Sequence, residues 1–182
     1  MITAITSAFA ARLQSRACLT PHTHPRFVIH DPRSPSPDPC QVLPDALRTR
    51  ADFEVINPQR QEVYVLAIDK CLYDSDGPTR CDCALIANEL LHFIEFKDIH
   101  SADNFGSARD CLDQLAASID DFFSRQIIPA GSTVYAFASV GYTSARPHNG
   151  ARLRLLRESF NRKVKARALR LRLIVDSELR LG

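Results

Sequence analysis

Three side chains suited to phosphodiester chemistry lie close together near the middle of the 182-residue sequence. Asp82 comes just before one apolar segment, and Glu95 and Lys97 stand at the end of the next. Two carboxylates can hold a hard divalent cation such as Mg²⁺ or Mn²⁺, and a lysine beside them can orient or activate a water molecule. These residue types predict hydrolysis of a phosphodiester, provided that the fold brings them to one surface.

A β-hairpin over residues 80–98 would bring them together. With residues 88–89 as a two-residue turn, Asp82 faces Glu95 on the neighbouring strand. Because side chains alternate along a strand, Lys97 falls on the same face as both acids. Two facing carboxylates about 5 Å apart repel each other by about 3 kcal/mol at an effective dielectric constant near 20. A bound cation would offset that repulsion. The alternative is a half-exposed hairpin whose acids point to solvent and pair with Lys97.

The rest of the chain predicts an α/β fold with a mixed central sheet flanked by helices. Residues 1–41 are expected to form an N-terminal tail and a proline-rich linker, both poorly ordered, and residues 42–182 a single domain. Hydrophobic spacing and turn residues predict the following elements. They are a short helix at 43–50, strands at 53–56, 62–68, 81–87 and 90–97, a helix at 107–126, a strand at 133–140, a helix at 151–167 and a strand at 171–175.

The segment Arg80-Cys81-Asp82-Cys83-Ala84-Leu85-Ile86, followed by Phe93-Ile94-Glu95-Phe96-Lys97, resembles the active-site hairpin of the PD-(D/E)xK (restriction-endonuclease-like) nuclease superfamily. The resemblance covers residues 52–140 and implies an αβββαβ core. It implies that Asp82 and Glu95 bind Mg²⁺ or Mn²⁺ and that Lys97 orients or activates the attacking water.

Three further features bear on this resemblance. Some members of the superfamily carry a glutamine on the following helix, which Gln114 matches, and a tyrosine four residues later, where this chain has Ser118. Some add an acid from an earlier element, for which Glu54 and Asp69 are the candidates. The proline that often precedes the aspartate is replaced by Cys81.

Charge is distributed unevenly along the sequence. Residues 151–182 carry a net charge of about +7, whereas the first 150 residues carry about −5. The predicted helix at 151–167 turns Arg154, Arg162 and Lys165 outward, where they are suited to binding nucleic-acid phosphates. The alternative is a solvated helix face that keeps the protein soluble.

Six cysteines, at 18, 40, 71, 81, 83 and 111, are too dispersed for a disulfide scaffold. A reduced cytoplasmic protein is therefore expected, and residues 1–20 leave open a targeting segment. A zinc site built from Cys71, Cys81 and Cys83 with Cys40 or the His22/His24 pair is a weaker alternative, because the spacing is not that of a zinc ribbon.

The sequence thus predicts a Mg²⁺- or Mn²⁺-dependent nuclease that acts on DNA and has no membrane association. A homodimer or a protein partner remains open. The rival hypothesis is a catalytically inactive module that keeps the nuclease fold and binds nucleic acid or a protein.

Overall fold

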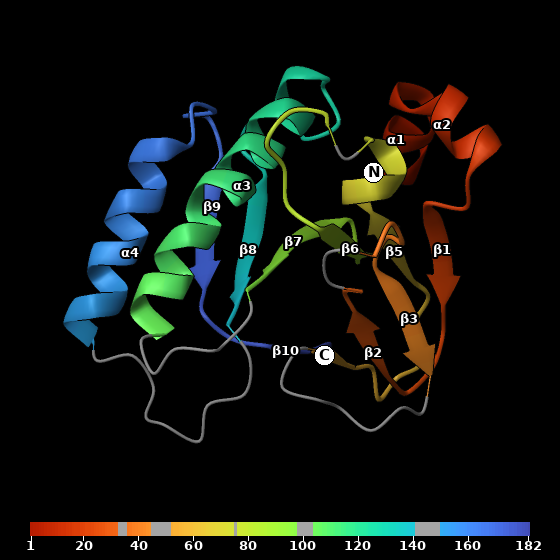
Figure 1. Cartoon of the computed structure of the whole chain (residues 1–182), viewed down its shortest axis with the longest axis horizontal. Coiled ribbons are helices and arrows are strands. Elements are labelled where there is room, and N and C mark those ends of the chain that lie inside the picture. The colour runs from red at the N-terminus through yellow and green to blue at the C-terminus, as the bar shows by residue number, and fades with distance from the viewer. Residues whose placement is uncertain (33–35, 45–51, 75, 98–103, 141–149) are drawn as a thin grey trace.

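The computed structural model is a mixed α/β fold with two mixed sheets and several helices (Figure 1). It describes residues 1–182 except 33–35, 45–51, 75, 98–103 and 141–149. The helices are α1 (Ile2–Ala8), α2 (Ala10–Ser15), α3 (Asn104–Ser124) and α4 (Gly150–Lys163), with a short irregular turn η1 (Ile68–Leu72). No helix in the described part of the chain combines the length and apolar character needed to cross a membrane.

The larger sheet, here called sheet A, has the strand order β1-β5-β6-β7-β8-β9. Its strands are β1 (Leu19–His22), β5 (Val63–Ala67), β6 (Cys83–Ala87), β7 (Leu90–Phe96), β8 (Thr133–Ser139) and β9 (Arg170–Ile174). Strands β1, β5, β6 and β7 pair antiparallel, whereas β7, β8 and β9 run parallel. Helices α3 and α4 make the two crossovers that parallel pairing requires.

The β6–β7 hairpin has the predicted register. Ala84 pairs with Phe93, and the pairing continues to Ala87 opposite Leu90. Asn88 and Glu89 both have positive φ, 49° and 59°, as a two-residue type I′ turn requires. Asp82 stands one residue before β6, and continuing the register by one residue places it opposite Glu95.

Helices α3 and α4 cover one face of sheet A (Figure 1). The residues of this core alternate along the strands, as Ala84 and Ile86 do on β6 and Leu91 and Phe93 do on β7. From α3, Leu112, Leu115 and Ile119 recur at helical spacing and are fully buried against them. Glu95 belongs to the same alternating series, so this face places it under the helix.

The opposite face of sheet A packs against a second sheet that the sequence did not predict, here called sheet B. Its strand order is β10-β4-β2-β3, with β2 (Arg26–His30), β3 (Gln41–Pro44), β4 (Phe53–Ile56) and β10 (Glu178–Arg180). Cys83 and Leu85 contribute to the apolar layer between the sheets, together with Phe27 and Phe53 of sheet B. The strand predicted at 53–56 exists with those bounds but lies in this second layer.

The N-terminal residues differ from the expected poorly ordered tail. Helices α1 and α2 pack through Ile5 and Phe9 on the helix-covered core, and β1 pairs with β5 at the edge of sheet A. A disulfide joins Cys18 to Cys71, which corrects the expectation that the cysteines are all reduced. The many prolines had indicated an extended linker. Proline is nevertheless compatible with edge strands, and Pro21 lies in the edge strand β1.

The other elements follow the prediction with shifted ends. Helix α4 stops at Lys163 instead of 167, because Val164 to Leu169 turn into β9. The predicted helix at 43–50 is wrong at its start, since Leu43 and Pro44 end strand β3, and residues 45–51 lie outside the described residues.

Candidate active site

The carboxyl groups of Asp82 and Glu95 are close enough for each to shift the pKa of the other. Asp82 is half-buried, and its Oδ2 accepts a 2.7 Å hydrogen bond from the backbone N–H of Phe96. Glu95 is only 1% exposed, and its Oε2 has no hydrogen-bond donor among the described residues. Two acceptor groups therefore meet at a buried position, which is stable only if a proton or a cation lies between them.

The electrostatics of the pair follow from this burial. Burial, with the nearby charge of Asp31, raises the pKa of Asp82 from 3.8 to about 6. Burial and the charge of Asp82 raise the pKa of Glu95 well above its usual value, although Lys97 opposes this shift. In the metal-free protein the pair consequently retains a proton at pH values where exposed carboxyls have lost theirs.

Lys97 completes the set on the same face. Its Nζ lies 3.0 Å from Glu95 Oε1, and its side chain is 31% exposed. Burial lowers the pKa of the Lys97 ammonium, but the charge of Glu95 and their hydrogen bond outweigh that effect, so the net shift is upward. Lys97 is therefore a cation near neutral pH and a hydrogen-bond donor.

Gln114, from the middle of α3, accepts a 2.8 Å hydrogen bond from Lys97 Nζ through its Oε1. The structure thus brings together all four of the residues predicted for catalysis: Asp82, Glu95, Lys97 and Gln114. One helical turn further on, Ser118 Oγ accepts a 2.8 Å hydrogen bond from the backbone N–H of Cys81. This contact fixes the residue before Asp82 to α3.

An open groove of about 430 Å³ runs along this site. Asp82 and Gln114 line it, together with Asp69, Asp113 and the segment Gly77–Arg80. Asp69 accepts a 2.7 Å hydrogen bond from Arg80 Nε, and its backbone N–H donates to the carbonyl of Asp82. Of the two candidates for an additional acid, Asp69 is thus beside the site.

Glu54, the other candidate, lies in sheet B and pairs with Arg26. It is on β4, in the layer that covers the opposite face of sheet A from α3.

Arg80 and Ser118 are site residues whose roles the sequence did not predict. Ser118 follows Gln114 by four residues, so helical spacing places it on the same side of α3 and could have revealed it. Arg80 lies in a proline- and glycine-containing segment and is only 8% exposed. Nothing in the local sequence indicates that burial, which depends on Asp69 and on α3.

The residues predicted to bind nucleic acid are exposed but lie apart from this site. Arg154 pairs with Glu158 on α4, and Arg162 and Lys165 are exposed near the end of that helix. Asp113, at the edge of the groove, pairs with Lys163 of α4, and Asp120 accepts from the backbone just after α4, whereas Gln114 and Ser118 contact residues of the site. Helix α3 therefore lies between α4 and strands β6 and β7 (Figure 1).

Most of the cysteines are buried in the core or joined in the disulfide. Cys81, Cys83 and Cys111 are buried free thiols, and Cys71 is in the disulfide. Within the described ranges no group of three or more histidine, cysteine and acidic side chains is arranged to hold a metal ion. The zinc alternative consequently has no supporting geometry among the residues described.

Comparison with known proteins finds no matching family model, no matching curated protein and no matching solved structure.

Proposed function

We propose that this chain is a divalent-metal-dependent nuclease that hydrolyses phosphodiester bonds in DNA. The observation that carries the proposal is the carboxyl of Glu95, which is almost fully buried, leaves Oε2 without a donor and lies against Asp82. A purely structural role would favour a neutral side chain at this position, because burying a second acid beside Asp82 is unfavourable.

The donor set of this pair suits Mg²⁺ or Mn²⁺. Mg²⁺ is commonly bound by one or two carboxylates and completes its shell with waters and substrate phosphates, so two protein ligands are sufficient. Asp82 and Glu95 would hold the ion, and Oε2 of Glu95 would gain the partner that it lacks. When bound, the ion would supply Lewis acidity and lower the pKa of a bound water.

Lys97 would act on the attacking water and the phosphate beside the metal ion, and Gln114 would act on Lys97. Lys97 remains an ammonium, so it can donate hydrogen bonds to the attacking water and stabilise negative charge on the phosphate. Gln114 accepts from Lys97 Nζ and restricts where that cation lies. Gln114 is thus a positioning residue, because its side-chain oxygen contacts Lys97.

The connectivity of sheet A supports the same proposal. An antiparallel β5–β6–β7 meander followed by α3 and by β8 parallel to β7 is the order expected for the βββαβ part of a PD-(D/E)xK core. The acids would then stand on the second and third strands, as the resemblance implies. Assignment to that superfamily is part of this proposal.

The direct test is incubation of the purified chain with labelled single- and double-stranded DNA and RNA, in Mg²⁺, in Mn²⁺ and in EDTA. We expect cleavage of DNA that needs the metal and is lost in Asp82→Asn. Calorimetric titration with Mn²⁺ gives an independent reading, because the same variant should lose metal binding. Wild-type protein that neither cleaves any substrate nor binds Mn²⁺ at Asp82 would favour the inactive binding module.

A further inference from the structure

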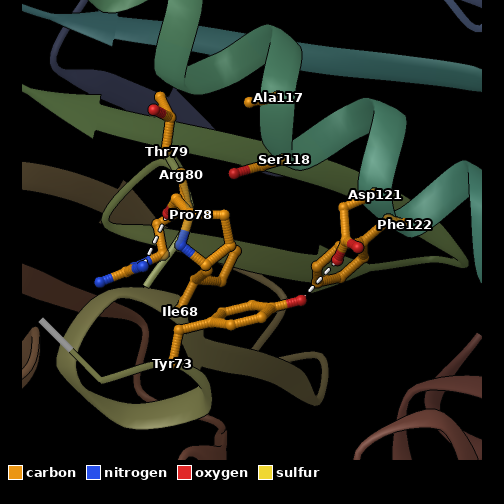
Figure 2. Close-up of a pocket in the computed structure, with 9 residues that line it drawn as sticks. All are labelled: Ile68, Tyr73, Pro78, Thr79, Arg80, Ala117, Ser118, Asp121 and Phe122. Carbon is orange, nitrogen blue, oxygen red and sulfur yellow. Dashed lines mark hydrogen bonds between the residues drawn. The ribbon is translucent and has the colours of Figure 1, made fainter. Parts of the chain in front are cut away.

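A second cavity, of about 270 Å³, opens beside the proposed catalytic groove (Figure 2). One wall comes from α3 and the other from Ile68, Tyr73 and residues 78–80. Its lining residues are Ile68, Tyr73, Pro78, Thr79, Arg80, Ala117, Ser118, Asp121 and Phe122. The cavity is smaller than the 300–1,000 Å³ or so that is usual for drug-sized ligands, so it suits one flat ring system.

Tyr73 is held in place as a wall of this cavity. Its hydroxyl donates a 2.5 Å hydrogen bond to Asp121 Oδ2, which Figure 2 shows as a dashed line. The ring also meets the edge of Phe9, with centroids 5.9 Å apart, and Arg80 lies 5.6 Å from its centroid. A tyrosine fixed on several sides loses little further conformational entropy when a ligand packs against it.

The cavity adjoins the groove that contains Asp82. Pro78, Thr79 and Arg80 line both of them. On α3, Gln114 belongs to the groove and Ser118, one turn along, to the cavity. The cavity and the groove therefore lie side by side, with the segment Pro78-Thr79-Arg80 common to both.

We propose that this cavity binds one unpaired nucleobase of the strand whose phosphodiester lies in the groove at Asp82, an inference that rests on the proposed nuclease function. Aromatic and apolar walls next to a phosphate-binding groove are the arrangement by which proteins hold splayed-out bases. A base can enter only after leaving its stack, so single-stranded DNA or a strand end is the preferred substrate. Duplex DNA must first be opened at that position.

The cavity binds the base by shape and stacking and does not select its identity through Arg80. The guanidinium of Arg80 already donates to Asp69 and to the carbonyls of Asp74 and Pro78. Each of its three nitrogens thus already donates a hydrogen bond within the protein. We expect all four bases to be accepted with modest differences, as is usual where stacking dominates.

The test fills the cavity without removing a contact. Ala117→Leu adds bulk from α3 into the lining, and Ala151→Leu, on the exposed surface of α4, is the matched control. The probe is a single-stranded oligodeoxynucleotide that carries 2-aminopurine at one position in turn, bound in Ca²⁺ and followed by fluorescence. Cleavage of single-stranded and duplex DNA in Mn²⁺ is measured in parallel, and thermal unfolding checks that each variant is folded.

We expect quenching at one position in wild-type protein and an affinity about fivefold weaker or more in Ala117→Leu, because stacking of one base is lost. Ala151→Leu should match wild type. Tyr73→Leu should weaken binding similarly, whereas Tyr73→Phe keeps the ring and should retain most of the affinity.

The outcomes separate the two proposals. Cleavage by wild type that is unchanged in a folded Ala117→Leu, with unchanged oligonucleotide affinity, overturns the base pocket and leaves the nuclease. Quenching that Ala117→Leu weakens, without cleavage by wild type, supports the pocket and overturns the nuclease. Absence of both quenching and cleavage overturns both proposals.

Discussion

The two flanks of helix α3 make different kinds of contact. On the site flank, Gln114 accepts from Lys97, Ser118 from the backbone of Cys81 and Asp121 from Tyr73, all in partly or fully buried surroundings. On the α4 flank, Asp113 pairs with Lys163 at an exposed position. Enclosed polar contacts fix geometry because water cannot replace a lost partner, whereas exposed pairs are readily replaced by water.

This difference indicates where function is concentrated on the helix. Contacts on the site flank position groups that would act on a substrate, and contacts on the α4 flank attach one helix to another. The following expectations test that comparison, beginning with the largest effect.

Glu95→Gln should reduce metal-dependent cleavage by more than about a hundredfold, since it removes a proposed metal ligand and even supporting partners of ligands contribute about 10–100-fold. The unfolding free energy of the metal-free protein should hold or rise, because a buried charge beside Asp82 is removed. Kinetics in Mn²⁺ and urea unfolding in EDTA measure the two effects. The matched control is Glu158→Gln on exposed α4, and equal activity in both variants would contradict the site.

Gln114→Ala should lower kcat by about 10–100-fold through misplacement of Lys97, with a smaller change in KM. Single-turnover cleavage isolates the chemical step. Gln14→Ala, at an exposed position of α2, is the control substitution. A change confined to KM would indicate that Gln114 binds substrate and does not position Lys97.

The metal-free protein should lose stability as pH rises from about 4 through 6. The folded-state pKa of Asp82 is raised from 3.8 to about 6, so its stabilising protonated form is complete below the unfolded pKa and lost as pH passes the folded one. The contribution is about 2–3 kcal/mol. Urea unfolding of wild type and Asp82→Asn in EDTA, at pH 4 and pH 7, should show a smaller loss in the variant. An equal loss of unfolding free energy in wild type and Asp82→Asn would refute the raised pKa of Asp82.

Ser118→Ala should lower the unfolding free energy by about 1–3 kcal/mol, because the buried N–H of Cys81 loses its acceptor. Ser124→Ala, at the exposed end of the same helix, should have little effect. Denaturant unfolding of both variants compares an enclosed contact with an exposed one on α3. Equal losses of unfolding free energy in Ser118→Ala and Ser124→Ala would contradict the difference between enclosed and exposed contacts.

Lys163→Gln should change the unfolding free energy by less than about 1 kcal/mol, and less still at high salt, because its ion pair with Asp113 is exposed. Cleavage should be near the wild-type rate. A loss comparable to that of Ser118→Ala would show that the α4 flank stabilises the protein as strongly as the site flank does.

The hairpin was predictable from the sequence because its causes are local. Alternation of side chains and a turn with two positive φ values fix which residues face each other, so Asp82 and Glu95 could be paired without any knowledge of distant elements. The longer strands and α3 were predictable for the same reason, since their periodicity lies within each segment.

Sheet B and the N-terminal elements were not predictable by that reasoning. Short strands such as β2 and β10 carry little periodic signal, and their pairing joins segments far apart in the chain. The Cys18–Cys71 disulfide likewise depends on β1 lying beside β5, which brings two distant cysteines together.

The sequence by itself determined the chemical types at the site and their order on one hairpin face. Only the tertiary structure decided that Glu95 is buried to 1% exposure, that Lys97 meets Gln114 and that a cavity opens beside them. The reason is that burial and pKa depend on what packs over a residue, here α3. Those contacts arise from the packing of the whole chain and have no local pattern.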